Sequence, residues 1–211
     1  MKVATREKNS IKPLFVTGIG TGVGKTIVSA IITEQLRGDY WKPVQAGDLD
    51  NSDSDRVKSL ISNSSSRIHP EQFRLKLAAS PDKAAALEGI TIKREQFVIP
   101  KTTNRLIIEG AGGLVVPLSA NFFMIDLIKL VNAEVVLVVR NYLGCINHTL
   151  LSYELLRMKG CTIKGLVFNG VMDEASKLAI CNYVPDEVKL YCVPEITPIT
   201  KQAISQLKTL F

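Results

Sequence analysis

Residues 14–30 read LFVTGIGTGVGKTIVSA, and this stretch decides how the rest of the chain is interpreted. An apolar run ends in glycines, the glycines lead into Gly24-Lys25-Thr26, and an apolar segment typical of a helix follows. Strand, glycine-rich loop and helix in this order predict a phosphate-binding loop, because the free N–H groups at the helix start point at an anion. Lys25 would place its charge at the outer phosphates, and the Thr26 hydroxyl would bind magnesium. The sequence therefore predicts nucleotide binding.

The spacing inside this loop differs from the usual GxxxxGK[ST] pattern. Five residues, rather than four, separate Gly18 from Gly24, and Ile19 stands where the pattern requires glycine. An ordinary glycine turn before a helix is the alternative interpretation. Gly-Lys-Thr between an apolar strand and an apolar helix favours the phosphate-binding loop.

Composition indicates a globular protein that binds small anions. The chain has 211 residues, of which 46% are hydrophobic and 22% charged, so one domain with a sizeable core is expected over residues 1–211. The net charge is +6, but Lys and Arg are spread singly, which favours anionic small ligands over nucleic acid. Four cysteines without CxxC spacing and two histidines predict neither a zinc site nor a disulfide framework.

No stretch of the sequence is typical of a membrane or secretory segment. Residues 1–12 form a polar, basic lead-in without the apolar region of a signal peptide. The longest apolar runs, such as residues 135–139, are too short to span a bilayer. We therefore expect a cytoplasmic enzyme without membrane contact.

Strands and helices are predicted to alternate along the chain. Strands are expected at residues 14–16, 40–45, 105–109, 135–139, 163–169 and 188–193. Helices are expected at about residues 27–38, 57–61, 78–89, 122–131, 148–158 and 199–210. The apolar character of the strands predicts a mostly parallel sheet with helices on both faces. Ligands bind beyond the carboxyl ends of such strands, so the residues that follow each strand are candidates for the site.

Two candidates follow the second predicted strand. Lys42 would face the phosphates as a second cation, and a surface lysine is the alternative interpretation. Asp55 lies at an expected helix start, where a carboxylate either caps the helix or binds magnesium. Asp53 and Asp50 compete with it for the metal, because spacing alone does not separate the three.

Three further strand ends carry polar groups or free backbone N–H groups. Glu109 ends an apolar strand before Gly110-Ala111-Gly112-Gly113, which is the Walker-B position beside the phosphate loop. Gly144 precedes a helix start whose N–H groups suit a carboxylate, and Cys145 is more typical of a packed residue than of a nucleophile. Asn169 suits an adenine edge or, equally, a turn before Gly170.

These motifs, in this order from about Leu14 to Pro194, resemble the dethiobiotin synthetase family. EGAGG followed by LGCINH is more specific than a phosphate loop alone, and the five-residue gap in that loop is also similar to the family's. The segments that carry the resemblance are TGIGTGVGKT (17–26), WKPVQAG (41–47), SD (54–55), ASPDKAA (79–85), EGAGG (109–113), PLS (117–119), GCINH (144–148) and FNG (168–170).

The resemblance implies an ATP- and magnesium-dependent ring closure in biotin biosynthesis. The family converts 7,8-diaminononanoate and CO2 to dethiobiotin, with ADP and phosphate as the other products. One amine takes up CO2 as a carbamate, the carbamate oxygen attacks the γ-phosphate, and the second amine closes the cyclic urea. The resemblance also implies a homodimer in which two chains share each site.

The resemblance further assigns roles to residues. Lys25 and Lys42 would place cations between carbamate and triphosphate, and Thr21 would bind the nitrogen end of the diamine. Thr26, Asp55 and Glu109 would bind magnesium. The nucleotide would contact Gly22, Val23, Gly24, Lys25, Thr26, Ile27, Asp55, Glu109, Gly110, Ala111, Gly112, Asn169, Gly170, Val193 and Pro194. The substrate would contact Thr21, Lys42 and Ala46 and, from the other subunit, Leu143, Gly144, Cys145, Ile146 and Asn147.

Three residues depart from the family pattern, and three other protein classes are alternatives. Gly20 replaces an acid, Ala46 a serine or threonine, and Asp82 a histidine. A ParA/MinD-like partitioning ATPase would carry an additional lysine in the loop, which is missing here. A synthetase of the cobyrinic acid type would continue into a glutaminase domain, which we do not expect after Phe211. A pure nucleotide-binding module is the third alternative.

Overall fold

A seven-stranded sheet forms the centre of the molecule in the computed structural model, which describes residues 11–211. Its strand order is β11-β10-β9-β1-β6-β2-β4, and all six pairings are parallel. The first ten residues of the predicted lead-in lie outside the described range. The strands are β1 (Leu14–Gly18), β2 (Asp39–Trp41), β4 (Ile68–His69), β6 (Leu106–Glu109), β9 (Glu134–Val139), β10 (Thr162–Asn169) and β11 (Lys189–Val193).

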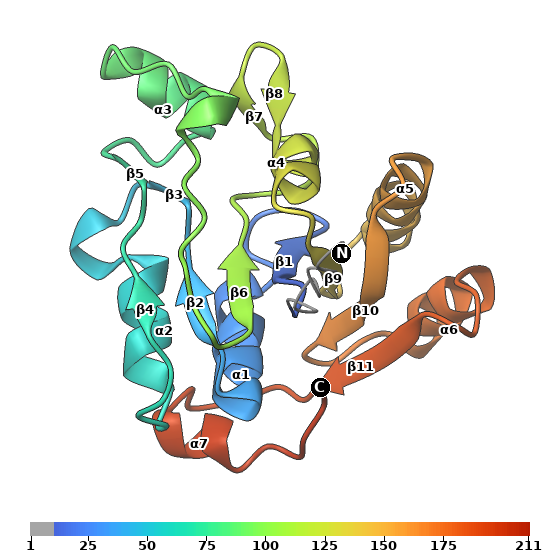
Figure 1. Cartoon of the computed structure of the whole chain (residues 1–211). Coiled ribbons are helices and arrows are strands. Elements are labelled where there is room, and N and C mark those ends of the chain that lie inside the picture. Colours follow the sequence, from blue (N-terminus) through green and yellow to red (C-terminus); the bar gives the residue numbers. More distant parts are fainter. Residues whose placement is uncertain (1–10) are drawn as a thin grey trace, which may run out of the picture.

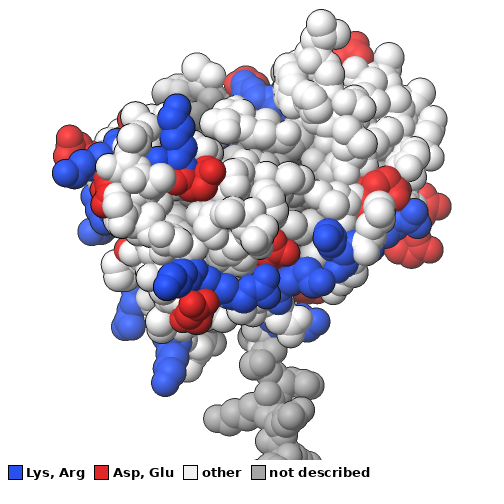
Figure 2. Space-filling view, turned by 90° about the horizontal axis from the view of Figure 1, so that it is seen from above, with Lys and Arg blue, Asp and Glu red and all other residues white. Residues whose placement is uncertain are grey.

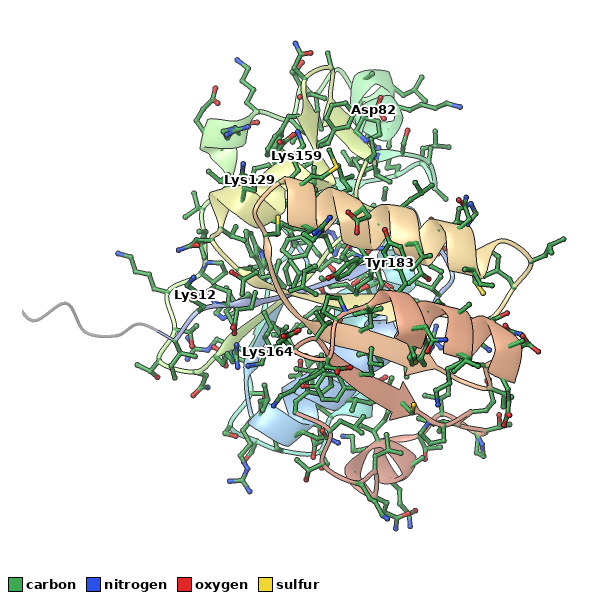
Figure 3. The ribbon with its side chains drawn as sticks, turned by 90° about the vertical axis from the view of Figure 1, so that its right-hand side faces the viewer. Lys12, Asp82, Lys129, Lys159, Lys164 and Tyr183 are labelled. Carbon is green, nitrogen blue, oxygen red and sulfur yellow. The ribbon has the colours of Figure 1, made fainter. Side chains whose placement is uncertain are left out.

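Helices cover both faces of this sheet, as predicted. In Figure 3, α4 and α5 lie above the sheet, and α1 and α7 lie below it. Figure 1 shows α5 and α6 together beside β10 and β11, with α2 next to α1 on the opposite side. The helices are α1 (Lys25–Leu36), α2 (Asp53–Leu60), α3 (Pro81–Leu87), α4 (Met124–Leu130), α5 (Cys145–Met158), α6 (Glu174–Tyr183) and α7 (Lys201–Ser205).

The innermost strands form the core of the sheet. All residues of β1 and β6 are buried, and so are all but the first of β9. Burial on both faces explains why these segments have unbroken apolar runs rather than alternation. The prediction of a parallel α/β fold is confirmed.

The strand predicted at residues 40–45 is in fact two strands. β2 ends at Trp41, and after Lys42-Pro43 the chain enters β3 (Val44–Ala46), which pairs with β5 (Phe73–Leu75) in a separate two-stranded sheet. Proline lacks an N–H group and cannot continue a ladder, so the chain leaves the central sheet here.

Other element boundaries also differ from the prediction. The helix expected at 148–158 begins three residues earlier, and the helix expected at 199–210 is limited to α7. β7 (Pro117–Ser119) and β8 (Phe122–Phe123) form an antiparallel pair that was not predicted, and β8 takes the first two residues of the helix expected at 122–131. Within residues 11–211, none of the helices combines the length and the apolar character needed to cross a membrane.

Candidate functional site

A cavity of about 780 Å³ lies beyond the carboxyl ends of the central strands. Its walls come from the loop before α1, the segment after β2, the start of α2 and the loop after β6. The last residue of β10 and residues that follow β9 and β11 complete it. This is the edge of a parallel sheet where ligands are expected to bind.

The glycine-rich loop forms one wall of the cavity and is tied to β10. Gly24 is the N-cap of α1 with φ 93°, and a Cβ atom there would lie 1.9 Å from Asn169 Nδ2, so both backbone and space require glycine. Asn169 is buried and donates a hydrogen bond from Nδ2 to the Val23 carbonyl over 2.9 Å. Lys25 is buried behind the loop, and its Nζ donates to the Gly20 carbonyl over 2.8 Å.

Lys42 lies at the centre of a buried charge cluster. Its Nζ is 2.6 Å from Asp53 Oδ2 and 3.1 Å from Glu109 Oε1, and it donates to the Gly110 carbonyl over 3.1 Å. Burial acts to lower the pKa of Lys42, but the carboxylates of Glu109 and Asp53 outweigh it and raise the pKa above its ordinary value. Lys42 is therefore a buried cation, and the surface-lysine alternative is wrong.

Lys25 lies in a different electrostatic environment from Lys42. Burial first, and then the nearby charge of Lys42, lower the pKa of Lys25 to about 8, although Glu109 and Asp53 act in the opposite direction. An anion such as a phosphate next to Lys25 would favour its charged form again. Of the two lysines in the cavity lining, Lys42 is paired with carboxylates, and Lys25 forms no salt bridge within residues 11–211.

Three oxygen-bearing side chains converge beside these lysines. Thr26 Oγ1 lies 2.9 Å from Asp53 Oδ1 and 3.0 Å from Glu109 Oε1. A hydroxyl and two carboxylates are hard oxygen donors of the kind that magnesium prefers, with phosphate oxygens supplying further ligands. The described part of the chain has no group of three or more His, Cys, Asp or Glu side chains arranged for a metal ion. Magnesium would therefore depend on Thr26 and the nucleotide as well as on the two carboxylates.

The structure places Asp53, rather than the predicted Asp55, beside the other candidate metal ligands. Asp55 Oδ2 accepts hydrogen bonds from Ser52 N over 3.1 Å and Ser52 Oγ over 2.9 Å, which closes a capping box at the start of α2. Asp55 is exposed and does not line the cavity, whereas Asp53 contacts both Thr26 and Lys42. The helix begins at Asp53, two residues before Asp55, so the first helical position faces the site. Asp50 also lies outside the cavity lining.

Most of the other predicted nucleotide residues lie around this cavity. Val23 and Gly110 contribute the carbonyls bound by Asn169 and Lys42, and the N–H of Gly170 donates to the Val193 carbonyl over 2.8 Å. The remaining predicted residues that line the cavity are Thr21, Gly22, Gly24, Lys25, Thr26, Ile27, Ala46, Ala111, Gly112 and Pro194.

Residues 143–147, predicted to bind substrate, are absent from the lining of this cavity. Gly144, with φ 104°, is the N-cap of α5, so the predicted helix start is present. Leu143 and Asn147 are exposed, and Cys145 is buried. Within one chain, the start of α5 therefore does not contribute to the lining of this cavity.

The three departures from the family pattern lie at different distances from the cavity. Gly20 contributes the carbonyl that Lys25 contacts, and Ala46 lines the cavity without a hydroxyl. Asp82 lies on α3 in the upper part of Figure 3 and is not a lining residue, although its neighbours Ser80 and Pro81 are.

Sequence reasoning missed several residues of the site. Tyr40 Oη donates to Glu109 Oε2 over 2.8 Å, and Gln45 Oε1 accepts from the Asp53 N–H over 3.3 Å. Arg140 and Glu195 line the cavity and form an ion pair with an N–O distance of 3.0 Å. The latter two follow β9 and β11, so the rule about strand ends would have found them. Tyr40 lies two residues before Lys42 and shares its side of the strand.

Comparison with known proteins gives close relatives. A family model described as an AAA domain matches residues 12–203. An ATP-dependent dethiobiotin synthetase from Cytophaga hutchinsonii is 46% identical over 196 residues, which cover 92% of this chain and 94% of the relative. A second, from Christiangramia forsetii, is 49% identical over 80% of this chain and 81% of the relative. A third, from Nitrobacter hamburgensis, is 39% identical over 92% and 91%.

A solved structure shares the fold. It is a nucleotide-binding protein from Archaeoglobus fulgidus in complex with ADP, and its TM-score is 0.51 at 12% identity. The match covers 92% of this chain and 85% of that chain. At this identity the likeness supports the fold alone.

Proposed function

The chain belongs to the ATP-dependent dethiobiotin synthetase family within the AAA domain proteins, and from this premise we propose that it converts 7,8-diaminononanoate and CO2 to dethiobiotin. It is an ATP-dependent ligase of biotin biosynthesis. The proposal adds the diamine, CO2 and magnesium, with ADP and phosphate as products, and treats residues 1–211 as one synthetase domain in the cytoplasm. Relatives of 39–49% identity favour it over a partitioning ATPase or a cobyrinic acid synthetase.

The observation that carries the proposal is the pair of lysines in one cavity with Thr26, Asp53 and Glu109. The reaction brings together a carbamate and a triphosphate, which repel each other. Lys42 is already held in place by two carboxylates, so its charge needs little reorganisation when substrate binds. Preorganised charge in a buried site stabilises a transition state far better than the same charge in water. Lys42 would therefore orient the carbamate and stabilise its attack.

Lys25 would act on the phosphate side. Its hydrogen bond to the Gly20 carbonyl is one that a phosphate oxygen can replace. Thr26, Asp53 and Glu109 would hold magnesium, which when bound neutralises charge on the phosphates and the transferred group. Thr21 lies in the same lining and would hydrogen-bond the nitrogen end of the diamine.

Asn169 supports binding of the base in the same cavity. Its amide nitrogen is used by the Val23 carbonyl, which leaves the amide oxygen as an acceptor. An adenine amino group is a matching donor. Pro194, in the same lining, would contact the ring.

A homodimer would bring the start of α5 to the substrate. Leu143, Leu151 and Met158 are 103%, 62% and 79% exposed, which leaves apolar surface along and before α5. In Figure 2 the upper right of the face shows a wide area without charged side chains, on the side where Figure 1 has α5 and α6. In the proposed dimer, residues 143–147 of the second chain would bind the substrate carboxylate with their backbone N–H groups.

The reaction is tested by incubation with ATP, magnesium, bicarbonate and the diamine. We expect a product with the mass of the cyclic urea and phosphate release that depends on the diamine. Omission of bicarbonate after degassing is the control. ATP hydrolysis that is indifferent to the diamine would contradict the proposal and favour a nucleotide switch.

The shared site has a separate test with two inactive variants. Lys42→Ala removes a group from one chain's cavity, and Asn147→Asp sets a negative charge at the start of α5. In a mixed dimer, one site collects both lesions and the other neither, so an equal refolded mixture should recover roughly a quarter of wild-type activity. A mixture proven to contain mixed dimers but still inactive would rule out sharing.

A further inference from the structure

The two oxygens of the Glu109 carboxylate have different partners. Oε1 lies 3.0 Å from Thr26 Oγ1 and 3.1 Å from Lys42 Nζ, and both of these side chains line the cavity. Oε2 accepts a hydrogen bond from Tyr40 Oη over 2.8 Å. Tyr40 is fully buried and lies outside the cavity lining. One oxygen therefore belongs to the site and the other to the protein interior.

The register of β2 explains why Tyr40 and Lys42 reach the same carboxylate. Tyr40 is paired with Ile107 and Trp41 with Ile108, so the next position along β2 is level with Glu109. Residues two apart on an extended chain point to the same side, which directs both side chains toward Glu109. The hydroxyl thus approaches the carboxylate from β2, and the ammonium from the residue directly after this strand.

We propose that Tyr40 is a positioning residue: its hydroxyl holds Oε2, so that the Glu109 carboxylate presents Oε1 to Thr26, Lys42 and the magnesium nucleotide. Among the contacts of residues 11–211, Tyr40 supplies the single hydrogen bond to Oε2. Without the Tyr40 hydroxyl, Oε2 of the buried Glu109 carboxylate would lose its hydrogen-bond donor. Rotation of the carboxylate toward Lys42 would give this oxygen a donor again. The inference rests on the proposed role of Glu109 in magnesium binding.

Tyr40→Phe removes the hydroxyl and keeps the ring. Calorimetry of ATP binding, with and without magnesium, separates positioning from simple support of the fold. We expect the magnesium-dependent gain in ATP affinity to fall about tenfold, which is typical of lost partners behind metal ligands, while affinity without magnesium is unchanged. In a Glu109→Gln background, Tyr40→Phe should have no further effect on this gain. Insertion of 4-aminophenylalanine at position 40 restores a donor and should restore the gain.

The matched control is Tyr183→Phe. Tyr183 Oη also donates to a carboxylate, Glu154 Oε1, over 3.1 Å, but this contact joins the end of α6 to α5 (Figure 3). This variant should keep the full magnesium-dependent gain. An unchanged gain in Tyr40→Phe, or no rescue by 4-aminophenylalanine, would overturn the positioning role. A wild-type chain whose ATP affinity ignores magnesium would overturn both this inference and the proposed magnesium site.

Discussion

A group of charged residues lies at each end of β2, and the two groups differ in their partners. Asp39, at the first residue, accepts hydrogen bonds from the Arg67 N–H and Asn104 Nδ2, both over 2.9 Å, and lies 3.1 Å from His69 Nε2. Beyond the other end, Lys42 contacts the side chains of Asp53 and Glu109 and the Gly110 carbonyl. The first group ties β2 to β4 and to the loop before β6. The second group faces the large cavity.

This difference shows that burial of a charge does not by itself mark a functional site. Asp39 is held by donors that are themselves parts of the fold, including the backbone N–H of Arg67. The Lys42 group consists of side chains that a ligand can contact directly, because all three line the cavity. Substitutions at the two ends should therefore separate into effects on turnover and effects on stability.

Lys42→Ala should have the largest effect. It removes a preorganised cation and leaves two carboxylates facing each other, so we expect turnover to fall by at least about a hundredfold. Steady-state rates of phosphate release in the presence of the diamine provide the measurement. Lys129→Ala, on the surface of α4 (Figure 3), is the matched control and should retain wild-type turnover. A Lys42→Ala enzyme within a few-fold of wild type would place Lys42 with Asp39 as a structural residue.

Asp53→Asn and Asp55→Asn should separate the metal carboxylate from the helix cap. The first removes a charge in contact with Thr26, so the magnesium concentration for half-maximal rate should rise about tenfold or more. The second weakens the capping box on an exposed turn and should leave that concentration within about twofold, with a small loss of thermal stability. Magnesium titrations of both variants, with melting curves, give the answer. The opposite pattern would restore Asp55 as the ligand.

The fold was largely predictable because its signals are strong and local. The apolar runs of β1, β6 and β9 and the Gly-Lys-Thr start of α1 each identify their element without knowledge of its neighbours. Short elements were missed, such as β4 with its two residues, because their pairing depends on neighbouring strands. The split after Trp41 was also missed, although Pro43 is the visible cause.

The site was predictable in its types of residue but less so in its geometry. Lys42 follows β2 and Glu109 is the last residue of β6, so the rule about strand ends identified both. The choice between Asp53 and Asp55 depended on where α2 begins, and element ends are the least certain part of a pattern. Tyr40 was missed because its role depends on the register between β2 and β6, which the sequence of β2 alone does not contain.

Asp39→Asn, unlike Lys42→Ala, should lower the stability of the protein and leave its turnover almost unchanged. The substitution keeps the shape of the side chain but loses the charge that three donors face, so we expect a loss of about 1–2 kcal/mol in the free energy of unfolding. Turnover and the magnesium dependence should remain within about twofold of wild type. Urea denaturation and steady-state kinetics on the same preparation make the comparison. A large loss of turnover in a stably folded variant would show that the two ends of β2 are coupled.

The smallest expected effect is a change with pH in the stability difference between wild type and Asp39→Asn. Burial acts to raise the pKa of Asp39, but hydrogen bonds from Asn104, Arg67 and other donors outweigh it and hold the pKa below its ordinary value of 3.8. A carboxyl group with a depressed folded-state pKa contributes stability that is fully present above the unfolded pKa and is lost as pH falls through the folded pKa.

The difference in unfolding free energy between wild type and Asp39→Asn should therefore be constant from about pH 7 to about pH 5 and shrink as pH falls below about 4. Urea rather than guanidinium keeps the ionic strength low during this series. Because His69 contacts Asp39 directly, the series is repeated in a His69→Gln background, which isolates the carboxylate. A difference that persists unchanged down to about pH 3 would mean that Asn104 and the Arg67 N–H stabilise the protonated carboxyl group as well as the charged one. The group at Asp39 would then depend on shape rather than on charge, and the contrast with the Lys42 group would be greater.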